Sequence, residues 1–505
     1  MTLLPQKVWL GAPVDRRYEL IDKKVQKTII EATTAAMLSG RFDLALEWLE
    51  QGRCFIWSQL LQLRTPLDKL QSLYPQLAEE LKLISHNLDV TSISRLGQQR
   101  LTDTAQTLHE SAQVYRRLAE KREELIESIQ QLSGFEDFLR PPNVSHLLGQ
   151  IQGEIIVVLI WNNLRCVALI ARASTPSIKH IHLRRVNPAD MEKAKLNLRS
   201  CLRTRFSRTP VWLEEEQSKV WFQDLLRMLW YDVAQPILDH LGITQVLPVD
   251  DLPRIIWCLT GPFSFLPIHA AGDYRSPSTI LSNLAVSSYI PNLGSINISK
   301  TISSTFSGIL AIGIASPIRG SAALPGTKVE LDRIEQQFTG LSLTRLEEEE
   351  ATADEVLRAM ANHSWVHFAC HASQSPTDPL KSAFQLYDKD LDLATICQTS
   401  MKNAGLAFLS ACQTATGDSA LPDEVVHLAA GLLMAGYPSI IATMWSINDS
   451  DAPLVAGKVY ECMLEGGSPD GRKAAIALHN ASIHLRNTIG IENFERWVPF
   501  IHIGC

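Results

Sequence analysis

Long apolar runs and paired cysteines are the features that this sequence most clearly lacks. No stretch approaches the roughly 18 apolar residues that a membrane-spanning helix needs, and the N-terminal residues carry no secretory signal core. The nine cysteines are scattered without paired spacing, which argues against a disulfide framework and fits a reducing compartment. We therefore expect a cytoplasmic protein without a membrane span.

Strong charge and common cofactor motifs are also missing. The net charge of −7 and the isoelectric point of about 6.1 give no reason to expect a nucleic-acid partner. The segment from Gly320 to Lys328 is too long, and its last residues are in the wrong order, for a phosphate-binding loop. No Gly-x-Ser-x-Gly elbow or Cys-x-x-Cys spacing occurs. We expect neither a metal nor another cofactor.

Helical periodicity dominates the first part of the chain. The 505 residues are enough for two or three domains, and residues 1–133 are predicted to be helical. Within them, residues 35–49 have the pattern of a helix, a turn at Gly40 and a second helix, with the Ala and Leu spacing of a stacked repeat. An ordinary helical bundle explains this pattern equally well. Residues 134–150, which contain two consecutive prolines, form the predicted linker.

Strands and helices alternate after the linker. This alternation predicts a mostly parallel sheet flanked by helices. We divide it into a companion part, 151–306, and a catalytic part, 307–505. The acidic run 347–350 is expected to be a solvated loop. Strands are predicted at 153–161, 165–171, 178–183, 254–259, 308–313 and 439–445.

Two further short apolar segments carry the candidate chemistry. Residues 365–372 include His371, and residues 406–414 include Cys412. Each segment is typical of a buried parallel strand that ends in turn-forming sequence. Because sites in open α/β sheets lie at the carboxyl ends of strands, we predict that both side chains face one cleft. A thiol is mostly protonated at neutral pH, so a neighbouring histidine would serve as its general base.

Structural explanations for these residues remain open. A free cysteine is often a core residue, and a histidine at a strand end can simply be hydrogen-bonded. His367 has the same strand parity as His371 and is interpreted as packing support. Cys370 points the opposite way and is interpreted as a core residue.

The two segments, together with 422–430, 435–441 and 442–449, resemble the CHAT family, whose relatives include caspases and separases. The motifs occur in the family's order, and the histidine precedes the cysteine by roughly forty residues, near the caspase-type offset of about 50. The resemblance extends more loosely over residues 150–505. The helical part resembles the tetratricopeptide arrays that are often fused to such domains.

This resemblance implies a caspase-like α/β fold and a cysteine endopeptidase with a His371–Cys412 dyad. Its substrates would be proteins or peptides, with a role in regulated cell death or signalling. The backbone amides of Ala372 and Cys412 would bind the developing oxyanion. The family usually has glycine at the position of Ala372, and positive φ is less accessible to alanine. A catalytically inactive interaction scaffold is therefore the alternative.

Two carboxylates are candidates for a substrate pocket. Glu424 and Asp449 each follow a strand end at the proposed cleft, so either could pair with a basic residue before the scissile bond. The separase and clostripain relatives share such a preference. Capping of helix starts explains both carboxylates equally well. The N-terminal helices would bind a regulatory protein.

Overall fold

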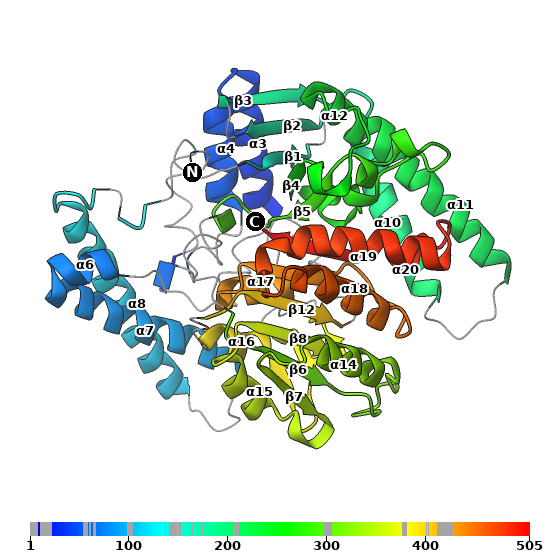
Figure 1. The fold of residues 1–505 in the computed structure, drawn as a ribbon. Coiled ribbons are helices and arrows are strands. Elements are labelled where there is room, and N and C mark those ends of the chain that lie inside the picture. Colours follow the sequence, from blue (N-terminus) through cyan, green and yellow to red (C-terminus); the bar gives the residue numbers. More distant parts are fainter. Residues whose placement is uncertain are drawn as a thin grey trace. The chain divides into compact units, whose positions relative to one another are not determined.

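The computed structural model divides into two compact units, Met1–His146 and Leu147–Cys505. The first unit is helical, and the second combines one large sheet with helices (Figure 1). The structure describes residues 9–10, 23–53, 59, 62–63, 67–97, 105–136, 138–140, 149, 153–162, 165–172, 175–205, 212–296, 306–375, 381–399, 401, 403–411 and 428–505.

Helix pairs build the first unit, as the periodicity predicts. Helix α3 turns through Gly40, at φ +70°, into α4. The two helices approach so closely that a Cβ on Gly52 would lie 2.5 Å from the Ile29 side chain. Buried Arg122 donates hydrogen bonds to Ser85 and to the carbonyl of Gln62. The likeness to tetratricopeptide repeats stays a prediction. The helices are α3 (Lys23–Leu38), α4 (Phe42–Gly52), α6 (Asp68–Leu73), α7 (Pro75–Gly97) and α8 (Ala105–Gln130).

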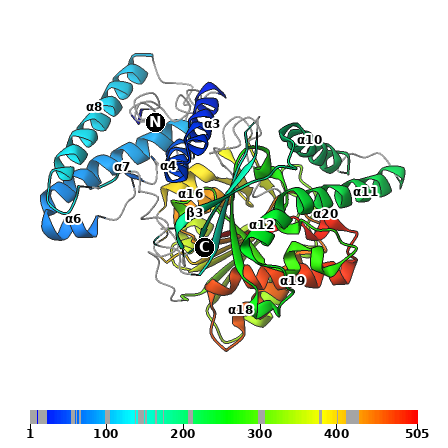
Figure 2. The same ribbon diagram turned by 90° about the horizontal axis from the view of Figure 1, so that it is seen from above.

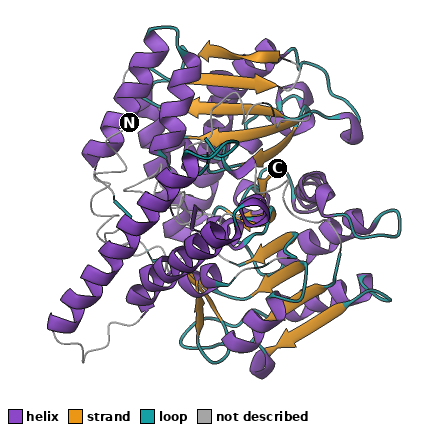
Figure 3. Ribbon diagram, turned by 90° about the vertical axis from the view of Figure 1, so that its left-hand side faces the viewer, coloured by secondary structure: helices purple, strands orange, loops and turns teal. Residues whose placement is uncertain are grey.

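One eleven-stranded sheet runs through the second unit, and its strands are orange in Figure 3. Their order is β3-β2-β1-β4-β5-β14-β13-β12-β8-β6-β7. The predicted companion and catalytic parts therefore share a single continuous sheet. Its strands are β1 (Ile155–Ile160), β2 (Val167–Arg172), β3 (Thr175–His182), β4 (Arg254–Leu259), β5 (Val286–Tyr289), β6 (Ile309–Gly313), β7 (Leu343–Glu347), β8 (Trp365–Ala369), β12 (Leu406–Ser410), β13 (Ser439–Thr443) and β14 (Phe500–Gly504).

Helices cover both faces of this sheet. In Figure 2, α12 and α19 lie on one side of it and α16 lies on the other. Helix α18 packs against both α14 and α19, and α19 lies against β5, β13 and β14. None of the described helices is long and apolar enough to cross a membrane. The helices are α10 (Pro188–Arg205), α11 (Trp212–Leu229), α12 (Gln235–Leu241), α14 (Gly326–Gln337), α15 (Ala353–Met360), α16 (Leu393–Gln398), α17 (Leu428–Ala435), α18 (Ala452–Leu464), α19 (Ala474–Ile489) and α20 (Phe494–Trp497).

Strand β14 joins two halves of the sheet: one contains β3, β2, β1, β4 and β5, and the other contains β13, β12, β8, β6 and β7. We call the contacts of β14 with β5 and β13 the joint. It runs antiparallel to β13 along its whole length but pairs in parallel with β5 at one position only, Ile503 with Tyr289. Buried His502 reinforces this joint, because its two ring nitrogens lie 3.0 Å from Ser288 Oγ on β5 and 2.9 Å from Ser439 Oγ on β13. The joint therefore depends on a side chain as well as on the backbone ladder.

Several elements differ from the sequence prediction. The acidic run 347–350 is not simply a solvated loop, because Glu347 ends strand β7 and a 3-10 turn, Glu348–Glu350, follows. Strands β5 and β7 and a small antiparallel sheet were not predicted. That sheet has the order β11-β10-β9 and consists of β9 (Ala372–Ser373), β10 (Ala383–Gln385) and β11 (Asp390–Asp392). These strands are short and polar, so they lack the apolar run or alternation on which strand prediction depends.

Three histidines of this unit predict a pH-dependent stability. Burial lowers the pKa of His269 and of His479 to about 4, and it lowers the pKa of His502 well below its usual value. An unfolded histidine binds its proton near pH 6.5. Between about pH 6.5 and 4 the unfolded chain therefore binds more protons than the folded chain, and stability falls as the pH falls. We expect a loss of a few kcal/mol over this window in urea titrations.

A matched pair of variants checks the cause. His502→Gln should weaken the pH dependence between about pH 6.5 and 4, because it removes one titrating group, whereas substitution of exposed His240 by Gln should leave it unchanged. An unfolding free energy that stays flat or rises as the pH falls through this window would contradict the assignment.

Candidate active site

The two strands that were predicted to carry the chemistry are neighbours in the sheet. Strand β8 pairs in parallel with β12, and Ser410 lies opposite Ala369 at their carboxyl ends. Each strand therefore ends two residues before its candidate, His371 or Cys412. His371 is described, whereas Cys412 and Glu424 lie outside the described residues.

The ring of His371 is oriented by a backbone carbonyl. Its Nε2 lies 2.8 Å from the carbonyl oxygen of Ala322, in the segment that follows β6. A carbonyl oxygen can only accept, so Nε2 carries the proton and Nδ1 of the neutral ring is the proton acceptor. The half-buried ring thus has the tautomer of a base that acts through Nδ1.

Ala372 adopts a backbone conformation that suits alanine. It lies in β9, and its φ is not positive, so the strain that motivated doubt about this position does not arise. Gln385 N–H donates to the carbonyl of His371, while Ala372 lies opposite Phe384. Hydrogen-bonded and non-hydrogen-bonded pairs alternate in an antiparallel ladder. The N–H of Ala372 therefore points away from β10.

The last residues before Cys412 are fixed by two side chains. Ser410 Oγ donates to Glu330 Oε2 at 3.0 Å. Thr443 Oγ1, on β13, donates to the carbonyl oxygen of Ala411 at 2.8 Å. Helix α14 and strand β13 therefore both hold the end of β12 in place.

Glu330, on helix α14, contacts residues of both β8 and β12. Its side chain is 2% exposed, and its Oε1 lies 3.2 Å from Nε2 of the fully buried His367 on β8. The alignment is poor for a hydrogen bond, so these two atoms are in close contact without forming one. His367 Nδ1 lies 3.1 Å from the hydroxyl of Tyr460 on α18. His367 thus provides more than packing, because it connects β8 to two helices.

Asp449 has a structural partner. Its Oδ2 accepts a hydrogen bond from the backbone N–H of Gly326 at 2.6 Å, at the start of α14. A Cβ on Gly326 would lie 2.3 Å from the carbonyl oxygen of Asp449, so only glycine fits there. A carboxylate at a helix start is favoured by the helix dipole. The carboxylate therefore helps to place α14, the helix that carries Glu330.

An open acidic pocket lies beyond the carboxyl ends of β6 and β7. Its volume is about 1030 Å³, and it is lined by the acidic residues 347–350, by Arg319 and by Tyr387. Glu348 Oε1 accepts hydrogen bonds from the backbone N–H groups of Ala315 and Ser316. Among the described residues, no group of three or more His, Cys, Asp or Glu side chains could hold a metal ion.

Sequence reasoning missed three contributors to the site. The Ala322 carbonyl has no sequence signature, because any residue supplies one. Thr443 was assigned only to a strand. Glu330 could have been suspected, since it shares the buried face of α14 with Thr327 and Ile334.

Removing the Glu330 carboxylate should destabilise the second unit. Glu330→Ala would remove the hydrogen-bond acceptor of Ser410 and the close contact with His367, and leaving a buried polar group without its partner costs about 1–3 kcal/mol. We expect a decrease of this order in the unfolding free energy measured with urea. Glu335→Ala, on the exposed side of the same helix, is the control and should cost under about 1 kcal/mol. Equal effects of the two substitutions would show that the buried contacts are energetically unimportant.

Comparisons with known proteins agree with this architecture. The family model of the CHAT domain matches residues 223–505, more than half of the chain. No curated protein matches the chain in sequence. A crystal structure of the Saccharomyces cerevisiae separase–securin complex aligns with 99% of this chain and 42% of that chain, at 11% identity and a TM-score of 0.50. The Arg-specific cysteine proteinase gingipain R aligns with 59% of this chain and 78% of that chain, at 13% identity and a TM-score of 0.38.

These comparisons confirm the predicted fold class. The second unit has a caspase-like α/β fold, and the region before it is helical. The chain spans less than half the length of the separase chain to which it is similar.

Proposed function

Because this chain belongs to the CHAT domain family, we propose that it is a cysteine endopeptidase with a His371–Cys412 dyad. The observation that carries the proposal is the aligned ending of two adjacent parallel strands, one of which leads into a histidine whose Nε2 is occupied. An orienting group on one ring nitrogen and a free second nitrogen are what a general base requires.

The proposed reaction begins with the transfer of the Cys412 thiol proton to Nδ1 of His371. The thiolate then attacks the substrate carbonyl, and the N–H groups of Ala372 and Cys412 bind the oxyanion. His371 returns the proton to the leaving amine, which leaves a thioester on Cys412. Water, deprotonated by His371, hydrolyses the thioester and regenerates the thiol.

Labelling with an electrophilic peptide probe tests the dyad. Cys412→Ala should abolish labelling, because it removes the nucleophile. His371→Ala should lower kcat/KM for a cleaved peptide by about 10²–10⁴-fold, the contribution of a general base. Substitution of Cys505 by Ser, at a partly exposed thiol distant in sequence, is the control and should label normally.

Two results would reject the dyad. One is labelling that persists in Cys412→Ala at another cysteine, and the other is undiminished cleavage by His371→Ala. A folded wild-type protein that takes up no probe and cleaves no peptide would instead support the alternative of an inactive interaction scaffold.

We propose further that the enzyme prefers a basic residue before the scissile bond, with Glu424 or Asp449 as the pairing carboxylate. The hydrogen bond from Gly326 uses only one acceptor site of Asp449, and a carboxylate offers about four. Its side chain is partly exposed, so a substrate guanidinium can still reach it.

A peptide library tests this preference. Cleavage after Arg or Lys should exceed cleavage after Leu at least about tenfold, the effect of one charge-assisted pair. Glu424→Gln or Asp449→Asn should reduce that ratio while leaving cleavage after Leu unchanged. Equal cleavage after Leu and Arg, unaffected by both substitutions, contradicts the proposal.

We also propose that the first unit binds a regulatory protein, with the peptidase acting in regulated cell death or signalling. Its helices carry exposed apolar side chains, including Leu73, Leu83 and Val114, which a partner could cover. The similar separase chain was crystallised with securin. Co-purification with and without residues 1–146 tests this proposal, which fails if partners bind equally to both forms.

A further inference from the structure

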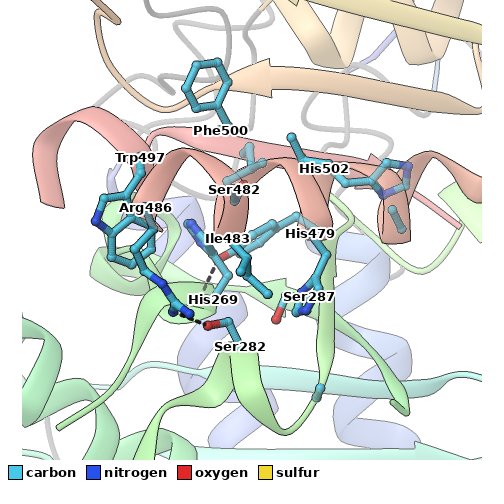
Figure 4. Close-up of a pocket in the computed structure, with 15 residues that line it drawn as sticks. His269, Ser282, Ser287, His479, Ser482, Ile483, Arg486, Trp497, Phe500 and His502 are labelled. Atoms are coloured by element: carbon cyan, nitrogen blue, oxygen red, sulfur yellow. Dashed lines mark hydrogen bonds between the residues drawn. The ribbon is translucent and has the colours of Figure 1, made fainter. Parts of the chain in front are cut away.

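A small cavity lies between helix α19 and the sheet, next to the joint between the two halves (Figure 4). Its volume is about 40 Å³. Helix α19 contributes one face, from Ala475 to Arg486 at spacings of three and four residues, and β5 and β14 contribute the opposite wall. Further lining residues, His269, Ser282, Ala285 and Trp497, come from the segments next to these elements, so the cavity lies where β14 connects the halves.

A buried arginine faces this cavity without a counter-charge. The side chain of Arg486 belongs to a residue that is 9% exposed, and its Nη1 donates to Ser282 Oγ at 3.3 Å. The guanidinium carbon lies 5.7 Å from the centre of the Trp497 ring. Its Nε is buried and has no hydrogen-bond partner among the described residues. No described carboxylate lies within 4 Å of it. Burial lowers the pKa of Arg486, as desolvation of an uncompensated cation does.

Two other arginines of this unit have carboxylate partners. Arg496 pairs with Asp451, and Arg345 pairs with Asp332 and with two glutamates. These side chains are more exposed than Arg486, yet each has a carboxylate. A buried charge is costly unless it is paired. Arg486 therefore lacks, among the described residues, the carboxylate that would offset the cost of burying its charge.

The other polar groups around the cavity are largely satisfied. His269 contacts the Tyr289 hydroxyl at 2.7 Å and the Val498 carbonyl at 2.9 Å. His502 is held by two serines, as described above. The exception is His479, whose Nε2 is buried without a partner among the described residues. The cavity therefore presents one uncompensated cation and one neutral hydrogen-bonding nitrogen.

We propose that this cavity binds a small monocarboxylate, whose oxygens pair with the Nε edge of Arg486. A guanidinium fork matches the two oxygens of a carboxylate in one plane. One positive charge balances one negative charge, which favours a monoanion over a phosphate dianion. The volume would hold about three waters, so the ligand has few heavy atoms. Apolar Ile483 and the Trp497 ring also line the cavity and suit a short hydrocarbon group.

This proposal does not depend on peptidase activity. A ligand at Arg486 would bridge α19, which also packs on β13, to the Ser282 segment that leads into β5. Ligand binding would therefore stabilise the joint between the halves. A measurement of thermal unfolding would detect this stabilisation directly.

Thermal unfolding of the full chain in sodium acetate, against sodium chloride at equal ionic strength, tests the site. A ligand that binds only the folded state raises Tm with concentration. We expect an increase of about 2 °C when acetate is roughly tenfold above its Kd, and a further increase with the logarithm of the acetate concentration beyond that. Arg486→Gln should abolish the increase. Arg472→Gln is the matched control, because it removes a charge just before α19 from an 82% exposed side chain, and it should retain the increase.

A second measurement keeps the test decisive if Arg486→Gln folds poorly. The methyl proton signal of acetate should broaden with the wild-type protein. Arg486→Lys, which keeps the charge but loses the fork, should weaken binding about tenfold.

Equal Tm values in acetate and chloride without broadening mean that the cavity holds only water. An acetate effect that survives Arg486→Gln places the site elsewhere. A phosphate effect as large as that of acetate rejects carboxylate selectivity.

Discussion

The parallel pairing of β8 with β12 is the constraint on which the candidate site depends. In this register His367 lies opposite Phe408, their rings are 4.8 Å apart, and Ser410 lies opposite Ala369. His367 and Ser410 therefore share a face of the sheet, and the Glu330 carboxylate reaches both of them. A slip of one residue would turn one of these side chains to the other face and leave the carboxylate buried without that partner. The buried contacts thus select the register that aligns the two strand ends.

The strands that the sequence predicts well are those with unbroken apolar runs. Strands β1, β4, β8 and β12 are buried at nearly every position, which is typical of parallel strands covered on both faces. Strand β5 escapes prediction because half of it is serine. Its hydroxyls have partners far away in sequence: Ser287 accepts from Trp257, and Ser288 accepts from Arg254. Local sequence does not reveal such partners, so a polar strand at the centre of a sheet looks like a loop.

The same limit applies to the candidate site. His371 and Ala372 were identified because their motif is distinctive, but the group that orients His371 is a backbone carbonyl and leaves no trace in composition. Asp449 could be assigned from sequence either to a substrate pocket or to a helix start. Coordinates supply its partner, Gly326, which is 123 residues away along the chain. Motifs therefore point to candidate side chains, whereas the atoms that orient them are found only in three dimensions.

Strand β13 lies between the joint at β14 and the candidate active site. Its first residue, Ser439, contacts His502 at the joint, and its last, Thr443, holds the carbonyl of Ala411 just before Cys412. A five-residue strand that is fully buried is a rigid link. Contiguity alone does not establish energetic coupling. It does mean that a displacement of β14 along β13 could not occur without breaking the contact of His502 with Ser439. Strand β13 therefore contacts both the joint at β14 and the residue that precedes the proposed nucleophile, Cys412.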